Sequence, residues 1–289
     1  MKIGFMGLGV MGTPMAMNLA RRYSLTVWNR SPSKYPLLRE AGAKTADTPR
    51  QLVQDTDVIF TMLSNDAAFK SILDSGFKDV LRGKILINTS SVSIDFSKYI
   101  ADEVHRAGGQ FIEMPVSGSK VPAEQGQLIA MIAGDRSVAE SIMTVVEPIT
   151  KEAVYCGEIG MGLKTKYAVN LYAITTTAAL AESMALARAQ NIDIEAFGQV
   201  LNAGPLASAH SKIKMAKMIS QDWSTQASIT DCYTITQLID SAAESIHAKT
   251  PLIHLTGLLY KEAVDRGLGD RDIIAVEKVL GLNDRKESS

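Results

Sequence analysis

Residues 2–12 are Lys2-Ile3-Gly4-Phe5-Met6-Gly7-Leu8-Gly9-Val10-Met11-Gly12, an apolar run followed by three glycines in the spacing G-x-G-x-x-G. An amphipathic stretch follows directly, as expected for a strand, a tight turn and a helix. In such a turn the first glycine permits the bend, the second lets a diphosphate approach the backbone, and the third lets the helix pack closely on the strand. The stretch therefore predicts a dinucleotide-binding turn made by Gly7, Leu8, Gly9, Val10, Met11 and Gly12.

The second predicted strand ends in polar residues that bear on the choice of dinucleotide. Asn29, Arg30 and Ser31 follow the apolar run 24–28. Proteins that bind NAD usually carry Asp or Glu here, because a carboxylate accepts hydrogen bonds from the ribose 2′-hydroxyl. A cation and two neutral polar groups suit a 2′-phosphate instead. We therefore predict NADP(H) as the cofactor, with these three residues beside its adenine ribose.

Apolar runs and amphipathic stretches alternate over the first half of the chain, which is typical of parallel strands joined by helical crossovers. Strands are predicted at 2–6, 24–28, 58–63, 85–89, 110–115, 128–133 and 153–155, with helices at 93–107 and 138–149. The second half has only helical periodicity, at 163–190, 193–202, 208–219, 233–248 and 252–266. The expected fold is an α/β domain with a doubly wound sheet over residues 1–162 and an all-α domain over residues 163–289, with a fraying tail at 283–289.

Composition narrows the class of protein. The 289 residues suit two domains, and 46% apolar with 21% charged residues is ordinary for a globular chain. A net charge of −1 argues against a nucleic-acid partner. Two cysteines and four histidines without ligand spacing predict a reduced, cytoplasmic protein with no metal. The longest apolar region, 167–181, is interrupted by Asn and Thr and is too short for a membrane span, so no membrane partner is expected.

Lys166 and Asn170 lie four residues apart in the long predicted helix, and therefore on one of its faces. Hydride delivery to a carbonyl builds negative charge on the oxygen, so a cation that can also donate a proton suits this chemistry. An asparagine beside it can hydrogen-bond the same oxygen or hold the lysine. We predict Lys166 as the proton donor and Asn170 as its support.

Three motifs resemble those of the beta-hydroxyacid dehydrogenase family, over nearly the whole chain. They are the turn at 7–12, the stretch Pro115-Val116-Ser117-Gly118-Ser119-Lys120-Val121-Pro122-Ala123-Glu124-Gln125-Gly126, and Gly160-Met161-Gly162 followed by Lys166 and Asn170. The second motif is most similar to the glyoxylate and succinic semialdehyde reductase branch. The resemblance implies a Rossmann-like domain and a helical domain that enclose the nicotinamide, with Lys166 as the catalytic acid or base.

The resemblance also implies roles for further residues. A substrate carboxylate would be bound by Ser117, Gly118 and Ser119. Met62 and Leu63 would cover the cofactor, and Ser90 and Ser91 would lie near its nicotinamide. Because members of the family are commonly dimers or tetramers, we expect a homodimer or homotetramer through the helical domain.

The chain departs from the family pattern in two places. Val169 stands where the family usually has a second asparagine beside Asn170. The family's Lys-Asp pair on a C-terminal helix is missing, since no lysine lies between 228 and 240. Asp231 and Tyr233 lie near that place and are candidates for substrate binding. The alternative is that Asp231 caps a helix and Tyr233 is a core aromatic.

Three functions remain open on the sequence. The first is NADPH-dependent reduction of small aldehydes or oxo acids, such as glyoxylate or succinic semialdehyde, to hydroxy acids, with Lys166 protonating the alkoxide. The second is reduction of imines, because imine reductases share the architecture and often lack the usual lysine; Asp231 or Tyr233 would then supply the proton. The third is a binding module that senses NADP(H) without chemistry, against which the retained Lys166 argues.

Overall fold

The computed structural model describes residues 1–280 and divides into two compact units, Met1–Lys166 and a second unit that begins at Tyr167. The division falls four residues after the predicted boundary, inside helix α10 (Met161–Ala189). The predicted tail at 283–289 lies outside the described residues.

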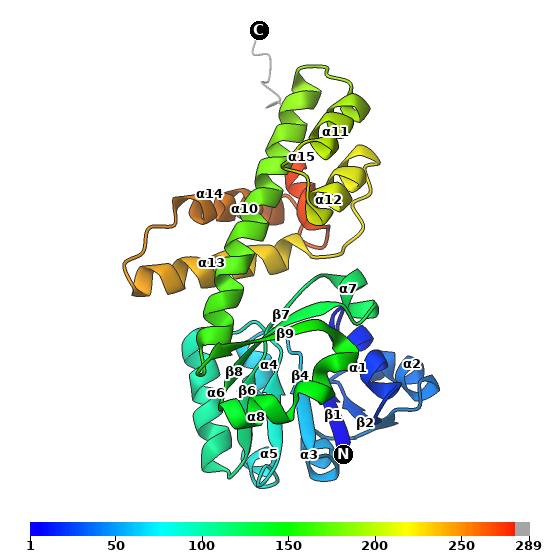
Figure 1. Ribbon diagram of the computed structural model, residues 1–289, viewed down its shortest axis with the longest axis vertical. Helices are drawn as coiled ribbons and strands as arrows, with labels where there is room; N and C mark the ends of the chain where they lie inside the picture. The colour runs from blue at the N-terminus through cyan, green and yellow to red at the C-terminus, as the bar shows by residue number, and fades with distance from the viewer. Residues whose placement is uncertain (281–289) are drawn as a thin grey trace. The chain divides into compact units, whose positions relative to one another are not determined.

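The first unit is built on a nine-stranded sheet in the order β3-β2-β1-β4-β5-β6-β8-β7, with β9 also paired to β8 (Figure 1). The strands are β1 (Lys2–Met6), β2 (Ser24–Trp28), β3 (Lys44–Thr45), β4 (Val58–Thr61), β5 (Ile85–Asn88), β6 (Gln110–Glu113), β7 (Val116–Ser117), β8 (Leu128–Gly134) and β9 (Thr150–Gly157). Strands β1 to β6 are parallel, which confirms the predicted α/β class. Strand β8 runs antiparallel to β6 and β7, so the parallel pattern predicted for these strands does not extend to the strand predicted at 128–133.

Helices cover both faces of this sheet. They are α1 (Gly12–Ala20), α2 (Tyr35–Glu40), α3 (Pro49–Asp55), α4 (Asp66–Lys70), α5 (Ser75–Lys78), α6 (Ile94–Arg106), α7 (Lys120–Glu124), α8 (Arg136–Ser141) and α9 (Met143–Val146). Because side chains alternate along a strand, Val58 and Phe60 share one core with Met15 of α1, whereas Ile59 points to the other face. The helix predicted at 138–149 is instead α8, α9 and a 3-10 turn at Glu147–Ile149, where Pro148 has no N–H to continue an α-helix.

The second unit is helical over its described residues, as predicted. Besides α10 it contains α11 (Ile194–Ala203), α12 (Ala209–Ile219), α13 (Ile229–Ser245), α14 (Pro251–Asp265), a 3-10 turn (Ile273–Val276) and α15 (Glu277–Leu280). Helices α13 and α14 pack side by side, and Gly257 permits the close approach, since a Cβ there would lie 2.9 Å from Thr236 Oγ1. Within residues 1–280, no helix combines the length and the apolar character of a membrane span.

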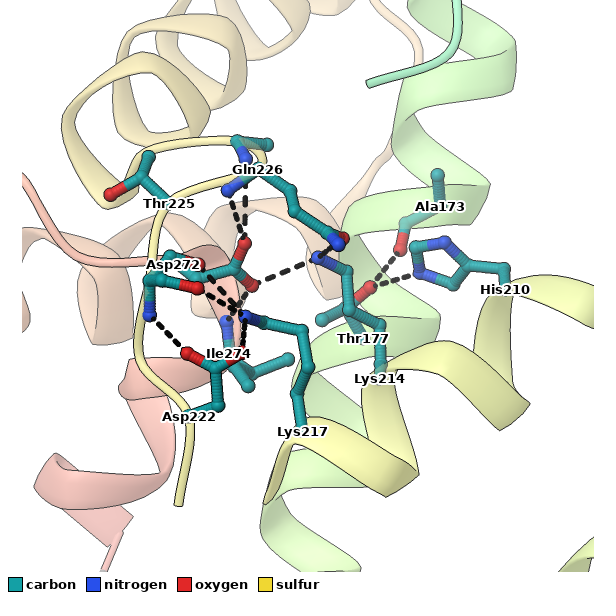
Figure 2. A network of polar contacts seen from close by, with 12 residues as sticks. Ala173, Thr177, His210, Lys214, Lys217, Asp222, Thr225, Gln226, Asp272 and Ile274 are labelled. Atoms are coloured by element: carbon teal, nitrogen blue, oxygen red, sulfur yellow. Dashed lines mark hydrogen bonds and ion pairs between the residues drawn. The ribbon is translucent and has the colours of Figure 1, made fainter. Parts of the chain in front are cut away.

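One buried ion pair and one partly exposed ion pair lie close to the start of α13 in the second unit (Figure 2). Lys214 Nζ of α12 lies 2.8 Å from Asp272 Oδ1, and the two side chains are 5% and 0% exposed. The other carboxylate oxygen of Asp272 accepts a hydrogen bond from Gln226 N at 2.8 Å. Lys217 Nζ bonds Asp222 at 2.7 Å and the backbone oxygen of Ser224 at 2.9 Å. These contacts fix the loop that leads into α13 onto α12 and the 3-10 turn.

Candidate functional site

The ends of five parallel strands lie in register across the sheet. Trp28, Met6, Thr61, Asn88 and Glu113 pair in turn from β2 to β6. Because these strands run in one direction, the residues that follow each of them emerge at the same edge. The strand order reverses between β1 and β4, and ligands of open α/β sheets bind at such a point. The structure therefore brings the predicted cofactor residues to one edge.

The glycine-rich turn at this edge has glycines of two kinds. A Cβ on Gly7, whose φ is +96°, would lie 2.1 Å from the backbone oxygen of Met62, and a Cβ on Gly12 would lie 1.9 Å from the oxygen of Gly7. Gly9 is different, because a Cβ there would meet no atom of the described chain within 4 Å. Packing explains Gly7 and Gly12, whereas the open space over Gly9 fits a group that approaches the backbone from outside, as a dinucleotide diphosphate does.

Asn29 ties the glycine-rich turn to the end of β2. Its Oδ1 accepts a hydrogen bond from Leu8 N at 2.9 Å, and its Nδ2 donates to the backbone oxygen of Ser31 at 2.8 Å. Arg30 and Ser31 are exposed. The sequence reasoning missed Lys34, an exposed cation that ends a 3-10 turn three residues after Ser31, and its closeness in sequence could have revealed it. Asn29 thus shapes the loop, and the exposed groups remain available to a ligand.

The loops after β4 and β5 are bonded to each other. Leu63 N donates to Ser90 Oγ at 2.8 Å, and Thr89 Oγ1 contacts Met62 Sδ at 3.2 Å. Ser90 is buried, whereas Met62, Leu63 and Ser91 are partly exposed. These predicted cofactor residues are therefore brought together as one rigid part of the edge.

Ser117 is the last residue of β7, and Gly118 and Ser119 connect this strand to α7. Gly118 has a φ of +130°, and a Cβ there would lie 2.7 Å from the Leu128 side chain. Asn18 of α1 donates from Nδ2 to the backbone oxygen of Ala123 at 2.9 Å, which attaches α7 to the helix that follows the glycine-rich turn. Ser117 and Ser119 are partly exposed, so their hydroxyls are accessible to a ligand.

Glu113, at the end of β6, is a buried acidic residue beside the start of α10 that the sequence reasoning did not single out. Its carboxylate is fully buried and accepts hydrogen bonds from Gly160 N, from Leu163 N at 2.9 Å and from Ser97 Oγ at 2.5 Å. Burial raises the pKa of the Glu113 carboxyl, and the hydrogen bonds from Ser97 and the backbone amides oppose that rise. The only sign in the sequence is an acidic residue inside an apolar strand.

Lys166 and Asn170 lie one turn apart near the start of α10, and each is 8% exposed. Val169 is 40% exposed, so it does not share their buried face. The helix thus places the two predicted catalytic side chains along one line. The missing second asparagine would have stood on a different face.

Asp231 and Tyr233 are not brought together. They lie two residues apart on α13, about 200° around the helix axis. Asp231 is exposed and does not cap α13; Ser228 Oγ does so by accepting from Asp231 N at 3.0 Å. Tyr233 lines a cavity of about 260 Å³ with residues of α13 and α14 that include His254 and Lys261. At most one of the two can therefore face a given ligand.

Alanine substitutions at the two kinds of glycine are expected to change different quantities, NADPH binding at Gly9 and fold stability at Gly12. Gly9→Ala should leave the melting temperature within about one degree of wild type, because the added Cβ meets no protein atom. The same Cβ should weaken NADPH binding at least about tenfold, because it would block the approach of the diphosphate. Gly12→Ala should destabilise the fold by about 1–3 kcal/mol through overpacking. Thermal unfolding and NADPH fluorescence titration measure both. Unchanged NADPH affinity in Gly9→Ala would contradict the diphosphate assignment.

Both halves of the chain match families of known proteins. Residues 2–157 match the family described as the NAD binding domain of 6-phosphogluconate dehydrogenase, and residues 160–280 match the one described as NAD-binding of NADP-dependent 3-hydroxyisobutyrate dehydrogenase. The chain is 32% identical over 290 residues to glyoxylate/succinic semialdehyde reductase 2, chloroplastic, of Arabidopsis thaliana, covering 99% of this chain and 81% of that protein.

Solved structures share the fold. A 3-hydroxyisobutyrate dehydrogenase from Salmonella typhimurium has a TM-score of 0.88 at 23% identity, covering 96% of this chain and 99% of that one. An imine reductase from Myxococcus stipitatus in complex with NADP+ has a TM-score of 0.68 at 21% identity, covering 97% and 100%. Known families match both halves of the chain, and the reductase from Arabidopsis thaliana aligns with 99% of it. The chain therefore belongs to the beta-hydroxyacid dehydrogenase family of NAD(P)-dependent oxidoreductases.

Proposed function

We propose that the protein reduces small aldehydes or oxo acids of the glyoxylate and succinic semialdehyde type to hydroxy acids, with NADPH as reductant. The observation that carries the proposal is Lys166, a lysine only 8% exposed in the second turn of α10. Asn170, one turn further along the helix, is equally buried, so both side chains lie on one face and could meet one substrate oxygen. The 32% identity to a reductase named for these two aldehydes supports the substrate class.

The residues at the sheet edge would hold the dinucleotide. Backbone N–H groups of the turn at 7–12 would bind the diphosphate at the start of α1, and Arg30 with Ser31 and Lys34 would bind the 2′-phosphate. Met62 and Leu63 would cover the cofactor, and Ser90 and Ser91 would lie near its nicotinamide. When bound, the dinucleotide would supply a hydride for the carbonyl carbon.

The chain's own residues would orient the substrate and handle the proton. The segment 117–119 would bind the carboxylate through hydroxyl and backbone N–H groups. Asn170 would donate a hydrogen bond to the carbonyl oxygen, which gains negative charge as the C=O π electrons move onto it. The Lys166 ammonium then gives that oxygen a proton, so that the alcohol forms, and the neutral amine takes a proton back from water.

Imine reduction is the second candidate. It is favoured by the missing lysine between 228 and 240 and by the fold shared with an imine reductase. A nucleotide-binding module without chemistry is the third. Absorbance of the reduced nicotinamide, followed with NADPH and either glyoxylate, succinic semialdehyde or a cyclic imine, separates the three. Turnover confined to the aldehydes supports the proposal, and turnover confined to the imine replaces it. NADPH binding without turnover of any of these substrates favours the binding module.

Arg30 tests the preference for NADPH. Arg30→Ala should raise the KM for NADPH about 10- to 100-fold, because a charge-assisted bond contributes about 1.5–3 kcal/mol. The KM for NADH should stay within about twofold, since NADH has no 2′-phosphate. Arg50→Ala is the control, because Arg50 is an exposed arginine of α3 paired only loosely with Asp79 at 3.7 Å. Equal changes for both dinucleotides in Arg30→Ala would refute the assignment.

Assembly and location remain predictions. Helix α10 carries Tyr172 and Leu186, which are 72% and 57% exposed, and a second copy would cover such apolar side chains in the proposed homodimer or homotetramer. Sedimentation of the full chain measures the state, and a monomer at micromolar concentration would contradict it. The cytoplasmic location needs a localisation experiment in the source cell.

A further inference from the structure

We propose that Glu113 is a positioning residue: its buried carboxyl group fixes the first turn of α10 to the sheet and so sets where Lys166 presents its ammonium group. The inference rests on the proposed role of Lys166 as proton donor. It adds a function for a side chain that touches neither the cofactor residues nor the substrate segment among the contacts described.

The first step of the argument is the set of donors that Glu113 gathers. Leu163 N lies 2.9 Å from Oε1, Gly160 N lies 3.2 Å from Oε1 and 3.1 Å from Oε2, and Ser97 Oγ lies 2.5 Å from Oε2. The first N–H groups of a helix have no partner within the helix. Glu113 accepts from one of them, Leu163 N, and from Gly160 N just before the helix, whereas Met161 N donates to the backbone oxygen of Glu158. A negative charge there also suits the positive end of the helix dipole.

The second step is the Gly160-Met161-Gly162 motif. A Cβ on Gly162 would lie 2.8 Å from the backbone oxygen of Met131 on β8 and 3.0 Å from Glu113 Oε1. Gly160 has a φ of +98°, which a side chain would strain. Glycine at 162 is therefore explained by the docking of the α10 start against β8 and Glu113, and glycine at 160 by its backbone conformation. The motif serves the helix that carries Lys166.

The third step is where Glu113 sits in the sheet. Glu113 ends β6 in register with the last residues of β1, β2, β4 and β5. The loops proposed to bind the cofactor follow directly after those four strands. Lys166 comes one turn after Leu163, the residue whose N–H Glu113 holds most closely. The Glu113 carboxylate thus connects β6, a strand of the sheet that carries the proposed cofactor loops, to helix α10, which carries the proposed proton donor. A displacement of about 1 Å in such a group can lower turnover about 100-fold.

The test compares Glu113→Ala with Glu113→Gln in the full chain. Glutamine can keep the contacts, with Oε1 accepting from the two amides and Nε2 donating to Ser97 Oγ. Glu113→Ala should lower kcat about 10- to 100-fold, with the NADPH dissociation constant within about twofold, and Glu113→Gln should stay within about threefold of wild type. Glu152→Ala, on the exposed strand β9, is the matched control. A normal kcat in Glu113→Ala, or an equal loss in Glu113→Gln, overturns the proposal.

A second measurement separates this inference from the proposed function. Hydrogen exchange at amides 160–166 should rise at least about tenfold in Glu113→Ala and remain near wild type in Glu113→Gln. If wild type turns over no carbonyl or imine, the proposed function fails while exchange still tests the anchor. Should Glu113→Ala not fold, Ser97→Ala removes one donor, and a kcat loss of two- to fivefold with faster exchange at 160–166 is expected. No change in either quantity in Ser97→Ala would count against the anchor.

Discussion

Replacing Lys166 by methionine is expected to lower kcat for aldehyde reduction by about 10²- to 10⁴-fold, the usual contribution of a positioned proton donor. Methionine keeps the unbranched stem that packs in this buried position and favours helix about as well as lysine. The alkoxide then loses its proton donor, while the groups proposed to bind NADPH at the sheet edge are unchanged. Steady-state kinetics and fluorescence titration of NADPH measure the two quantities separately.

Lys164 provides the control. It lies two residues earlier on the same helix and is exposed, so Lys164→Met changes the same charge on a different face. Its kcat should stay within about twofold of wild type. A kcat for Lys166→Met that is equally close to wild type would remove Lys166 from the mechanism. An unchanged kcat with a higher KM for the aldehyde would instead make it a binding residue.

The fold could be predicted where hydrophobic patterning is continuous. Strands β1 and β2 match their predicted bounds, because each is an apolar run that ends at a polar or glycine residue. Strands β3 and β7 have two residues each, too few to form a pattern. None of the eight residues of β9 is buried and half of them are exposed, so only three of the eight were predicted. The antiparallel direction of β8 depends on pairing across the sheet, which local patterning does not encode.

Helix ends could be predicted where a local sequence pattern marks them and not where none does. Helix α13 begins at Ile229, four residues before the predicted start, because Ser228 caps it. That cap is a local pattern, serine followed three residues later by an acidic residue, and it could have been recognised. The short apolar periodicity at 138–149 gave no indication of the break between α8 and α9.

The candidate site residues also differ in whether the sequence alone could reveal them. The glycine-rich turn, and Lys166 with Asn170, could be predicted as candidate site residues because the members of each group are contiguous or one helical turn apart. Glu113 could not, because its donors Ser97 and Gly160 lie 16 and 47 residues away. Asp231 and Tyr233 are candidates because they lie near the place of the family's Lys-Asp pair, and that place alone does not show which way each side chain faces on a helix.

Removing the carboxylate of Asp272 is expected to have the largest effect on stability. Asp272→Ala should lower the free energy of unfolding of the second unit by about 3–5 kcal/mol, because Lys214 would keep a buried charge without its partner. The N–H of Gln226 would also lose its acceptor. Urea unfolding followed by circular dichroism measures the change. Because the chain has two units, the transition is fitted with an intermediate rather than as two-state.

Two comparisons show whether the buried charge is the cause. Asp265→Ala removes an exposed carboxylate paired with Lys261 and should cost less than about 1 kcal/mol. Combining Lys214→Met with Asp272→Asn removes both charges and leaves one oxygen to accept from Gln226 N, so this double variant should be more stable than Asp272→Ala. If the double variant is as unstable as Asp272→Ala, the cost comes from lost backbone contacts rather than from an unpaired Lys214. If Asp272→Ala costs no more than Asp265→Ala, the network of Figure 2 does not hold the start of α13 in place.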